Sequence, residues 1–161
     1  AMNSAVEQKD VRNQAGLRGY IALALWMGGH HAEAEHELKI AHGLSADYQP
    51  MLMTVKAGLA CVYFSMGRHH EALNECKIVL AHLDAGGTMD ALEANLRLTH
   101  VQVLIALNRH PESLSAIRNA RHRLSERAQL IVDEKQRRQF LERVTENATT
   151  LDLAKTLLGH T

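Results

Sequence analysis

The sequence of 161 residues has little of what several classes of protein require. Lysine plus arginine and aspartate plus glutamate both number 18, so the chain lacks the basic excess that is normal for nucleic-acid binding. No run approaches about 18 uncharged apolar residues, which argues against a membrane partner or span. Only two prolines are present and β-branched residues are few, whereas leucine and alanine are abundant. This composition predicts an all-α fold.

Cysteine is also scarce. Cys61 and Cys76 are the only two, and no secretory leader precedes them, which predicts free thiols in a reducing compartment and a cytoplasmic location. Cys76 falls at an expected core position and is predicted to act as a small hydrophobe. Nothing near either thiol in the sequence supplies a base or an electropositive setting, and no phosphate-binding loop is present. The residues therefore predict no catalytic site, no cofactor and no enzyme activity.

What the chain does have is helical periodicity interrupted by short turns. The first helix is expected to begin at a capping box of Ser4 and Glu7 and to end at Gly28-Gly29. The later helices are expected at about 31–43, from Pro50 to Gly67, at about 69–83, from a cap at Thr88 to Leu107, from His110 to about Ile131, in a short segment capped by Asp133, and from a cap at Thr145 or Asn147 to near Gly159.

Three of the turns repeat. Gly29, Gly67 and Asn108 occupy equivalent places, and each is followed by a glutamate and a small residue, namely Glu33-Ala34, Glu71-Ala72 and Glu112-Ser113. The repeat period is 38 residues and then 41. A period of this size predicts a solenoid in which each pair of helices buries a face of its neighbour.

On these residues the chain resembles the tetratricopeptide repeat (TPR) family over about 15–126. That family places small residues where the two helices of a repeat cross, and the matching pairs here are Ala22 with Ala34, Ala60 with Ala72, and Val101 with Ser113. The resemblance implies a right-handed solenoid of three antiparallel helix pairs in residues 4–131. Closing helices of the same domain would follow in residues 132–161.

The tail, through segments 128–133, 137–144 and 151–155, resembles the C-terminal end of long-repeat TPR arrays in bacterial multidomain signalling ATPases and transcriptional regulators. This resemblance implies that the chain is the C-terminal piece of a longer regulatory protein. The function it implies is a non-enzymatic protein–protein interaction module. The alternative is a small-ligand sensor or oligomerisation domain of a LuxR-type ATP-binding transcriptional regulator, which would need a deep pocket with polar groups near Asn95, His100 and Gln102.

The resemblance also implies a binding surface, because the first helix of each TPR pair lines the concave face. The corresponding groove residues are Leu23, Trp26, Met27, Ala57, Cys61, Phe64, Leu98, Gln102 and Ile105. Since these are mostly apolar, the expected partner is the apolar face of an amphipathic helix, another domain of the same polypeptide, or a second copy in a homodimer. The other interpretation is that the array's own capping helices fill this groove.

Eleven histidines raise the question of a metal. His31, His69 and His110 fall on equivalent turns, but neighbouring helices lie about 8–10 Å apart whereas zinc needs ligands at about 2.1 Å. These histidines are therefore predicted to pack on the turns, with no metal bound. His100 is either a half-buried imidazole with a hydrogen-bond partner or a groove histidine that senses a ligand or pH.

Basic residues cluster in the sixth expected helix at Arg118, Arg121, His122, Arg123 and Arg127. Glutamates are interleaved with them and with Arg137-Arg138, so the run is predicted to be a solvated helix face with local ion pairs.

Overall fold

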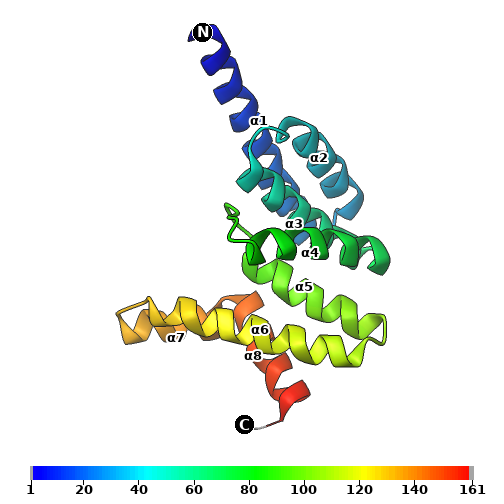
Figure 1. The fold of residues 1–161 in the computed structure, drawn as a ribbon, viewed down its shortest axis with the longest axis vertical. Coiled ribbons are helices and arrows are strands. Elements are labelled where there is room, and N and C mark those ends of the chain that lie inside the picture. The colour runs from blue at the N-terminus through cyan, green and yellow to red at the C-terminus, as the bar shows by residue number, and fades with distance from the viewer. Residues whose placement is uncertain (1, 160–161) are drawn as a thin grey trace. The chain divides into compact units, whose positions relative to one another are not determined.

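The computed structural model describes residues 2–159, with side chains from residue 9 onward. Every regular element in that range is a helix (Figure 1). The helices are α1 (Met2–Met27), α2 (His31–Leu44), α3 (Gln49–Ser65), α4 (His69–Asp84), α5 (Glu93–Ala106), α6 (His110–Gln129), α7 (Glu134–Arg143) and α8 (Thr145–Leu158). The all-α prediction is confirmed. Helix α1 begins before Ser4, and the side chains of the expected capping box, Ser4 and Glu7, lie outside the described residues.

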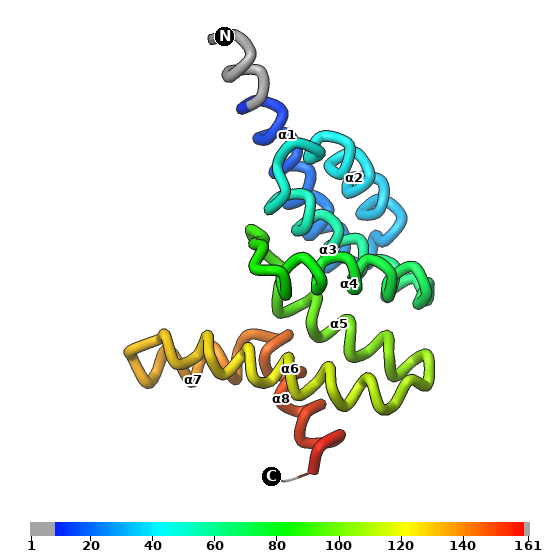
Figure 2. Tube along the Cα trace, in the orientation of Figure 1, coloured from blue at the N-terminus to red at the C-terminus, as the bar shows by residue number. Residues whose placement is uncertain are grey.

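The helices form two compact units, residues 1–93 and 94–161. In unit 1, α1 packs against α2, and α3 packs against α4 and against both earlier helices (Figure 2). Helix α3 is the most buried element of this unit, with Met53, Val55 and every residue from Ala57 to Tyr63 buried. In unit 2, Val101 of α5, Ile117 of α6 and Ala154 of α8 form a core cluster, and α7 packs against α6 and α8. The expected division at residue 131/132 stays a prediction.

The three predicted turns share one backbone geometry. Gly29, Gly67 and Asn108 have positive φ angles of 82°, 73° and 56°. The amide of the next residue donates to the carbonyl five positions back, at 2.8 Å, 2.9 Å and 2.8 Å for His30, Arg68 and Arg109. This is the Schellman motif, whose left-handed residue is usually glycine and sometimes asparagine. The predicted equivalence of the three turns is therefore confirmed in the backbone.

Small residues accompany each turn. The six residues of the predicted crossings, Ala22, Ala34, Ala60, Ala72, Val101 and Ser113, are all buried. A small side chain lets two helix backbones approach closely without a cavity or a clash. The six residues therefore lie in the interior of their units, and the crossings themselves stay a prediction.

Two expected helix starts are wrong. Helix α5 begins at Glu93 rather than after Thr88, because the amides of Asp90 and Ala91 donate to the Thr54 hydroxyl, which holds this segment against α3. Helix α8 begins after Val144, which has no capping side chain, so neither Thr145 nor Asn147 caps it. The Asn147 side chain instead donates to the Phe140 carbonyl at 2.9 Å. The cap at Asp133 is confirmed, since its carboxylate accepts from the Gln136 amide at 2.7 Å.

Candidate functional site

Unit 1 contains a mainly apolar cavity of about 130 Å³ among α1, α2 and α3. Its lining consists of Gly16, Gly19, Tyr20, Leu23, Leu38, Met51, Thr54, Val55, Asp90, Ala91 and Leu92. A smaller space of about 20 Å³ shares Gly19, Leu23, Leu38 and Leu92 with it and extends to Trp26 and Cys61. We call the two together the α1–α3 cavity.

Glycines on α1 create the room in the α1–α3 cavity. A Cβ atom at Gly19 would meet nothing within 4 Å, and one at Gly16 would only touch the Met51 methyl at 3.5 Å. Across the cavity, Gly58 of α3 faces Leu38, and a Cβ there would come within 3.0 Å of a leucine methyl. Gly58 therefore permits Leu38 to pack closely on α3, whereas Gly16 and Gly19 leave space that packing does not fill.

The edge of the α1–α3 cavity is formed by the chain's own loop. The Thr54 hydroxyl accepts from the amides of Asp90 at 3.0 Å and Ala91 at 3.2 Å, and it donates to the Pro50 carbonyl at 3.0 Å. These bonds bring Leu92 to the cavity with φ at 70°, a conformation that is uncommon for a bulky residue. In unit 1, the segment that closes this side of the cavity is therefore the loop of residues 90–92, not a capping helix.

The predicted groove residues of unit 1 divide into two groups. Leu23, Trp26 and Cys61 line the α1–α3 cavity, and the Trp26 indole N–H donates to the Ser65 hydroxyl at 2.9 Å. Ala57, Met27 and Phe64 are outside its lining. Ala57 is buried in α3, Met27 is 77% exposed, and the half-buried Phe64 ring lies 5.6 Å from the His69 ring. In unit 2, Leu98 is buried, whereas Gln102, Ile105 and His100 are half-buried.

Sequence reasoning missed an apolar surface beside the cavity. Leu17, Tyr20 and Ile21 of α1 are 61%, 75% and 42% exposed. Their spacing of three and four residues, which could be read as a core stripe, places them on one face of the helix. Single exposed apolar side chains are common on protein surfaces, whereas here three lie together on one helix face.

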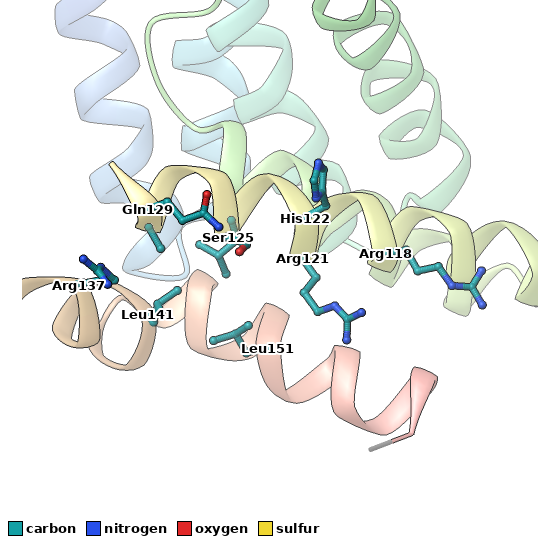
Figure 3. A pocket seen from close by; sticks show the side chains of 10 residues that line it. Arg118, Arg121, His122, Ser125, Gln129, Arg137, Leu141 and Leu151 are labelled. Atoms are coloured by element: carbon teal, nitrogen blue, oxygen red, sulfur yellow. The ribbon is translucent and has the colours of Figure 1, made fainter. Parts of the chain in front are cut away.

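Unit 2 contains a larger cavity of about 460 Å³ between α6, α7 and α8 (Figure 3). Three arginines line it, Arg118 and Arg121 from α6 and Arg137 from α7. The remaining lining residues are His122, Leu124, Ser125, Ala128, Gln129, Leu141 and Leu151. The sequence identified these arginines only as part of a solvated helix face.

Other basic residues of α6 do have the local partners that the sequence predicted. Arg123 pairs with Glu126 at 3.2 Å, and the His122 ring lies 3.4 Å from the same carboxylate. The Arg127 guanidinium lies 5.6 Å from the centre of the Phe140 ring. The predicted pairing is therefore confirmed for part of this helix.

A charged network joins α2 to the start of α4 in unit 1. Glu35 accepts from Lys39 and from Arg68, both at 2.7 Å, and Arg68 also binds Glu71. The Arg68 guanidinium lies 4.2 Å from the centre of the Tyr63 ring. Burial alone would raise the pKa of Glu35, but hydrogen bonds from Lys39 and Arg68 outweigh it and lower this pKa below its usual value. The network thus links α2 to the segment that begins α4.

The two thiols and the histidines of the turns differ in burial. Cys61 and Cys76 are buried and form no disulfide with each other, and burial raises the pKa of the Cys76 thiol. His31 and His69 are half-buried on their turns, whereas His110 is exposed, so the expected packing is wrong for His110. Among the described residues, no three histidine, cysteine or acidic side chains come together as metal ligands. No helix in the described part of the chain has the length and hydropathy needed to cross a membrane.

Comparisons of this chain with protein-family models, with curated proteins and with solved structures give no match.

Proposed function

We propose that this chain is a non-enzymatic protein-interaction module of a larger regulatory protein, and that a partner segment inserts an apolar side chain into the α1–α3 cavity. The single observation that carries this proposal is the cavity itself, a mainly apolar space over Gly19 that no side chain of unit 1 fills. Filling such a space removes apolar surface from water, which stabilises a complex.

The size of the cavity favours a side chain as its occupant. Sites for small organic ligands usually measure about 300–1,000 Å³, and an apolar cavity of about 150 Å³ is large enough for a benzene ring. The 130 Å³ of the α1–α3 cavity is thus suited to one aliphatic or aromatic side chain. This favours the interaction module over a small-ligand sensor for unit 1.

The surface next to the cavity supports a helical partner. Leu17, Tyr20 and Ile21 lie exposed on α1, and Tyr20 also lines the cavity. An amphipathic helix binds by laying its apolar face on such a surface while one or two anchors enter a pocket. Tyrosine and tryptophan are common at the centres of interfaces, and here Tyr20 and Trp26 flank the space.

The repeated turns support the repeat architecture that forms part of this proposal. Three Schellman turns with buried small residues beside them are compatible with a right-handed, TPR-like stack of helix pairs. In such a module the first helix of each pair carries the partner contacts, as the α1–α3 cavity would do here. We place this module in a cytoplasmic signalling or transcription-regulating protein on the strength of the tail resemblance.

The test uses Gly19→Leu, because a leucine at this position has space for its Cβ and extends into the cavity. The matched control is Gly43→Leu on α2, where a Cβ also meets nothing within 4 Å and which lies outside the cavity. Both changes replace a helical glycine and so should raise the unfolding free energy by up to about 1 kcal/mol.

Affinity capture with the parent domain and both variants, with quantitative identification of the bound proteins, then separates the outcomes. We expect at least one protein that the parent and Gly43→Leu retain and that Gly19→Leu loses. Identical sets of bound proteins for all three domains would contradict the proposed use of the cavity.

A further inference from the structure

Among the described residues, the arginines of the unit 2 cavity have no acidic partner, unlike Arg109 and Arg123 of the same unit. Arg118 and Arg121 lie three residues apart on α6, and in Figure 3 the Arg121 side chain extends toward α8 whereas that of Arg118 extends along α6. None of the ten lining residues is an aspartate or glutamate. Within residues 9–159, neither guanidinium has an ion pair or a hydrogen bond, whereas Arg109 and Arg123 each pair with a glutamate.

The third arginine of this cavity is held in place. Arg137 donates from Nε to the Ile131 carbonyl at 3.0 Å and from Nη2 to the Val132 carbonyl at 3.4 Å. An arginine carries five N–H donors, so three of its N–H groups are still available to a ligand. Its bonds to the turn between α6 and α7 fix the guanidinium before any ligand arrives, which lowers the entropy cost of binding.

Four apolar side chains line the space between these cations, beside the polar residues His122, Ser125 and Gln129. They are Leu124 and Ala128 of α6, and Leu141 of α7 and Leu151 of α8, which Figure 3 labels. The cavity volume of 460 Å³ falls within the range of about 300–1,000 Å³ that is usual for small-molecule sites. No phenylalanine, tyrosine or tryptophan lines it, so the stacking that commonly holds a nucleobase is absent from this lining.

We propose that this cavity binds a small organic anion in which an apolar body joins two acidic groups, either carboxylates or phosphates. One acidic group lies on Arg118 and Arg121, since a guanidinium matches the two oxygens of a carboxylate or phosphate. The other lies on Arg137, and the apolar body covers Leu124, Leu141 and Leu151. This site is in unit 2 and is independent of the partner surface proposed for unit 1.

The experiment measures binding of defined anions by titration calorimetry at fixed ionic strength. The first series is the linear dicarboxylates from succinate to sebacate, with acetate and octanoate as singly charged controls. The second series is the alkane bisphosphonates of matched length, which shows which acidic group the site prefers. We expect affinity to rise with chain length to a maximum, because only a long enough anion reaches both groups of arginines.

Two charge-matched variants locate the binding. Arg121→Gln removes a cation from the cavity, whereas Arg138→Gln removes one from α7 at an exposed position outside the lining. The best anion should bind at least about tenfold more weakly to Arg121→Gln, because charge-assisted hydrogen bonds are lost, and nearly as before to Arg138→Gln and to Gly19→Leu. Arg118→Gln provides a second cavity variant, and circular dichroism verifies that each variant is folded.

Three results would overturn the proposal. One is that no two-headed anion binds more tightly than acetate, and another is that Arg138→Gln weakens binding as much as Arg121→Gln does. The third is that an acidic peptide binds at this cavity while every small anion fails. The last result would assign the site to a protein partner.

Discussion

The two units differ most in the chemistry of their cavities. In unit 1 the space is small and apolar, and it exists because Gly16 and Gly19 have no side chains to fill it. In unit 2 the space is more than three times larger and is bordered by arginines. Both units nevertheless use the same Schellman turn between paired helices. The repeated turn thus sets how two helices meet, and the residues on the surrounding elements decide what the space between helices can bind.

Two arginines, one from each unit, show a similar contrast. Arg68 in unit 1 binds two carboxylates and lies on the Tyr63 ring, so this guanidinium has three partners within the fold. Arg121 in unit 2 has no such partner within the described residues. Cations held by several partners act as structural groups, whereas an unpaired cation in a cavity is available to a ligand.

The largest expected effect tests whether unit 2 has a core of its own. Ile117→Ala removes a fully buried side chain from the cluster with Val101 and Ala154, and it should lower the unfolding free energy by roughly 2–5 kcal/mol. Denaturant unfolding measures the loss, and hydrogen exchange should locate it in α5, α6 and α8. The control is Ile78→Ala on α4, where the side chain is exposed. Equal losses for the two variants would contradict the assigned core.

The turns and the core of the helix pairs could be predicted from the sequence because their causes are local. Gly29, Gly67 and Asn108 are residue types that tolerate a positive φ, and each is followed at a constant distance by a small residue. A helix pair needs only a short turn and a close crossing. Both requirements select particular residue types at a fixed spacing in the sequence.

The edges of the two cavities could not be predicted because they depend on residues far apart in the sequence. Leu92 reaches the α1–α3 cavity only because Thr54, on another helix, binds the amides of Asp90 and Ala91. The unpaired state of Arg118 and Arg121 depends on which faces of α7 and α8 lie opposite them. Glutamates interleaved in the sequence predicted local pairs for all of these arginines, but among the described arginines of α6 only Arg123 pairs with a glutamate.

A smaller effect tests the charged network of unit 1. The pKa of Glu35 is lower in the folded chain than its value of about 4.5 in the unfolded chain. The ionised carboxylate therefore stabilises the fold fully at a pH above about 4.5, and this stabilisation is lost as the pH falls through the lower pKa of the folded state. Glu35→Gln should therefore cost up to about 1 kcal/mol at neutral pH, because the pair with Arg68 is partly exposed to solvent.

Unfolding of the parent and of Glu35→Gln by urea across a pH series measures this dependence. The difference between the two proteins should shrink as pH falls below about 4.5. Glu146→Gln on α8 is a suitable control, since it alters a carboxylate outside this network. A difference that is unchanged by acid would show that Glu35 acts through packing rather than through its charge.

The smallest expected effect separates the two kinds of arginine on one helix. Arg118 and Arg121 lie three residues apart on α6 without acidic partners, and like charges at this spacing destabilise a helix by roughly 0.2–0.5 kcal/mol. Arg121→Gln should therefore raise the unfolding free energy by about that amount, while Arg123→Gln, which breaks a pair with Glu126, should lower it by a similar amount. Both variants lose the same charge from α6, so the overall charge of the chain cannot account for opposite signs.

Differential scanning calorimetry at low ionic strength resolves the two shifts in unfolding free energy, and added salt should shrink both. If Arg121→Gln instead destabilised unit 2 by more than Arg123→Gln does, Arg121 would have to be a structural residue. The contrast between a paired and an available arginine would then no longer hold.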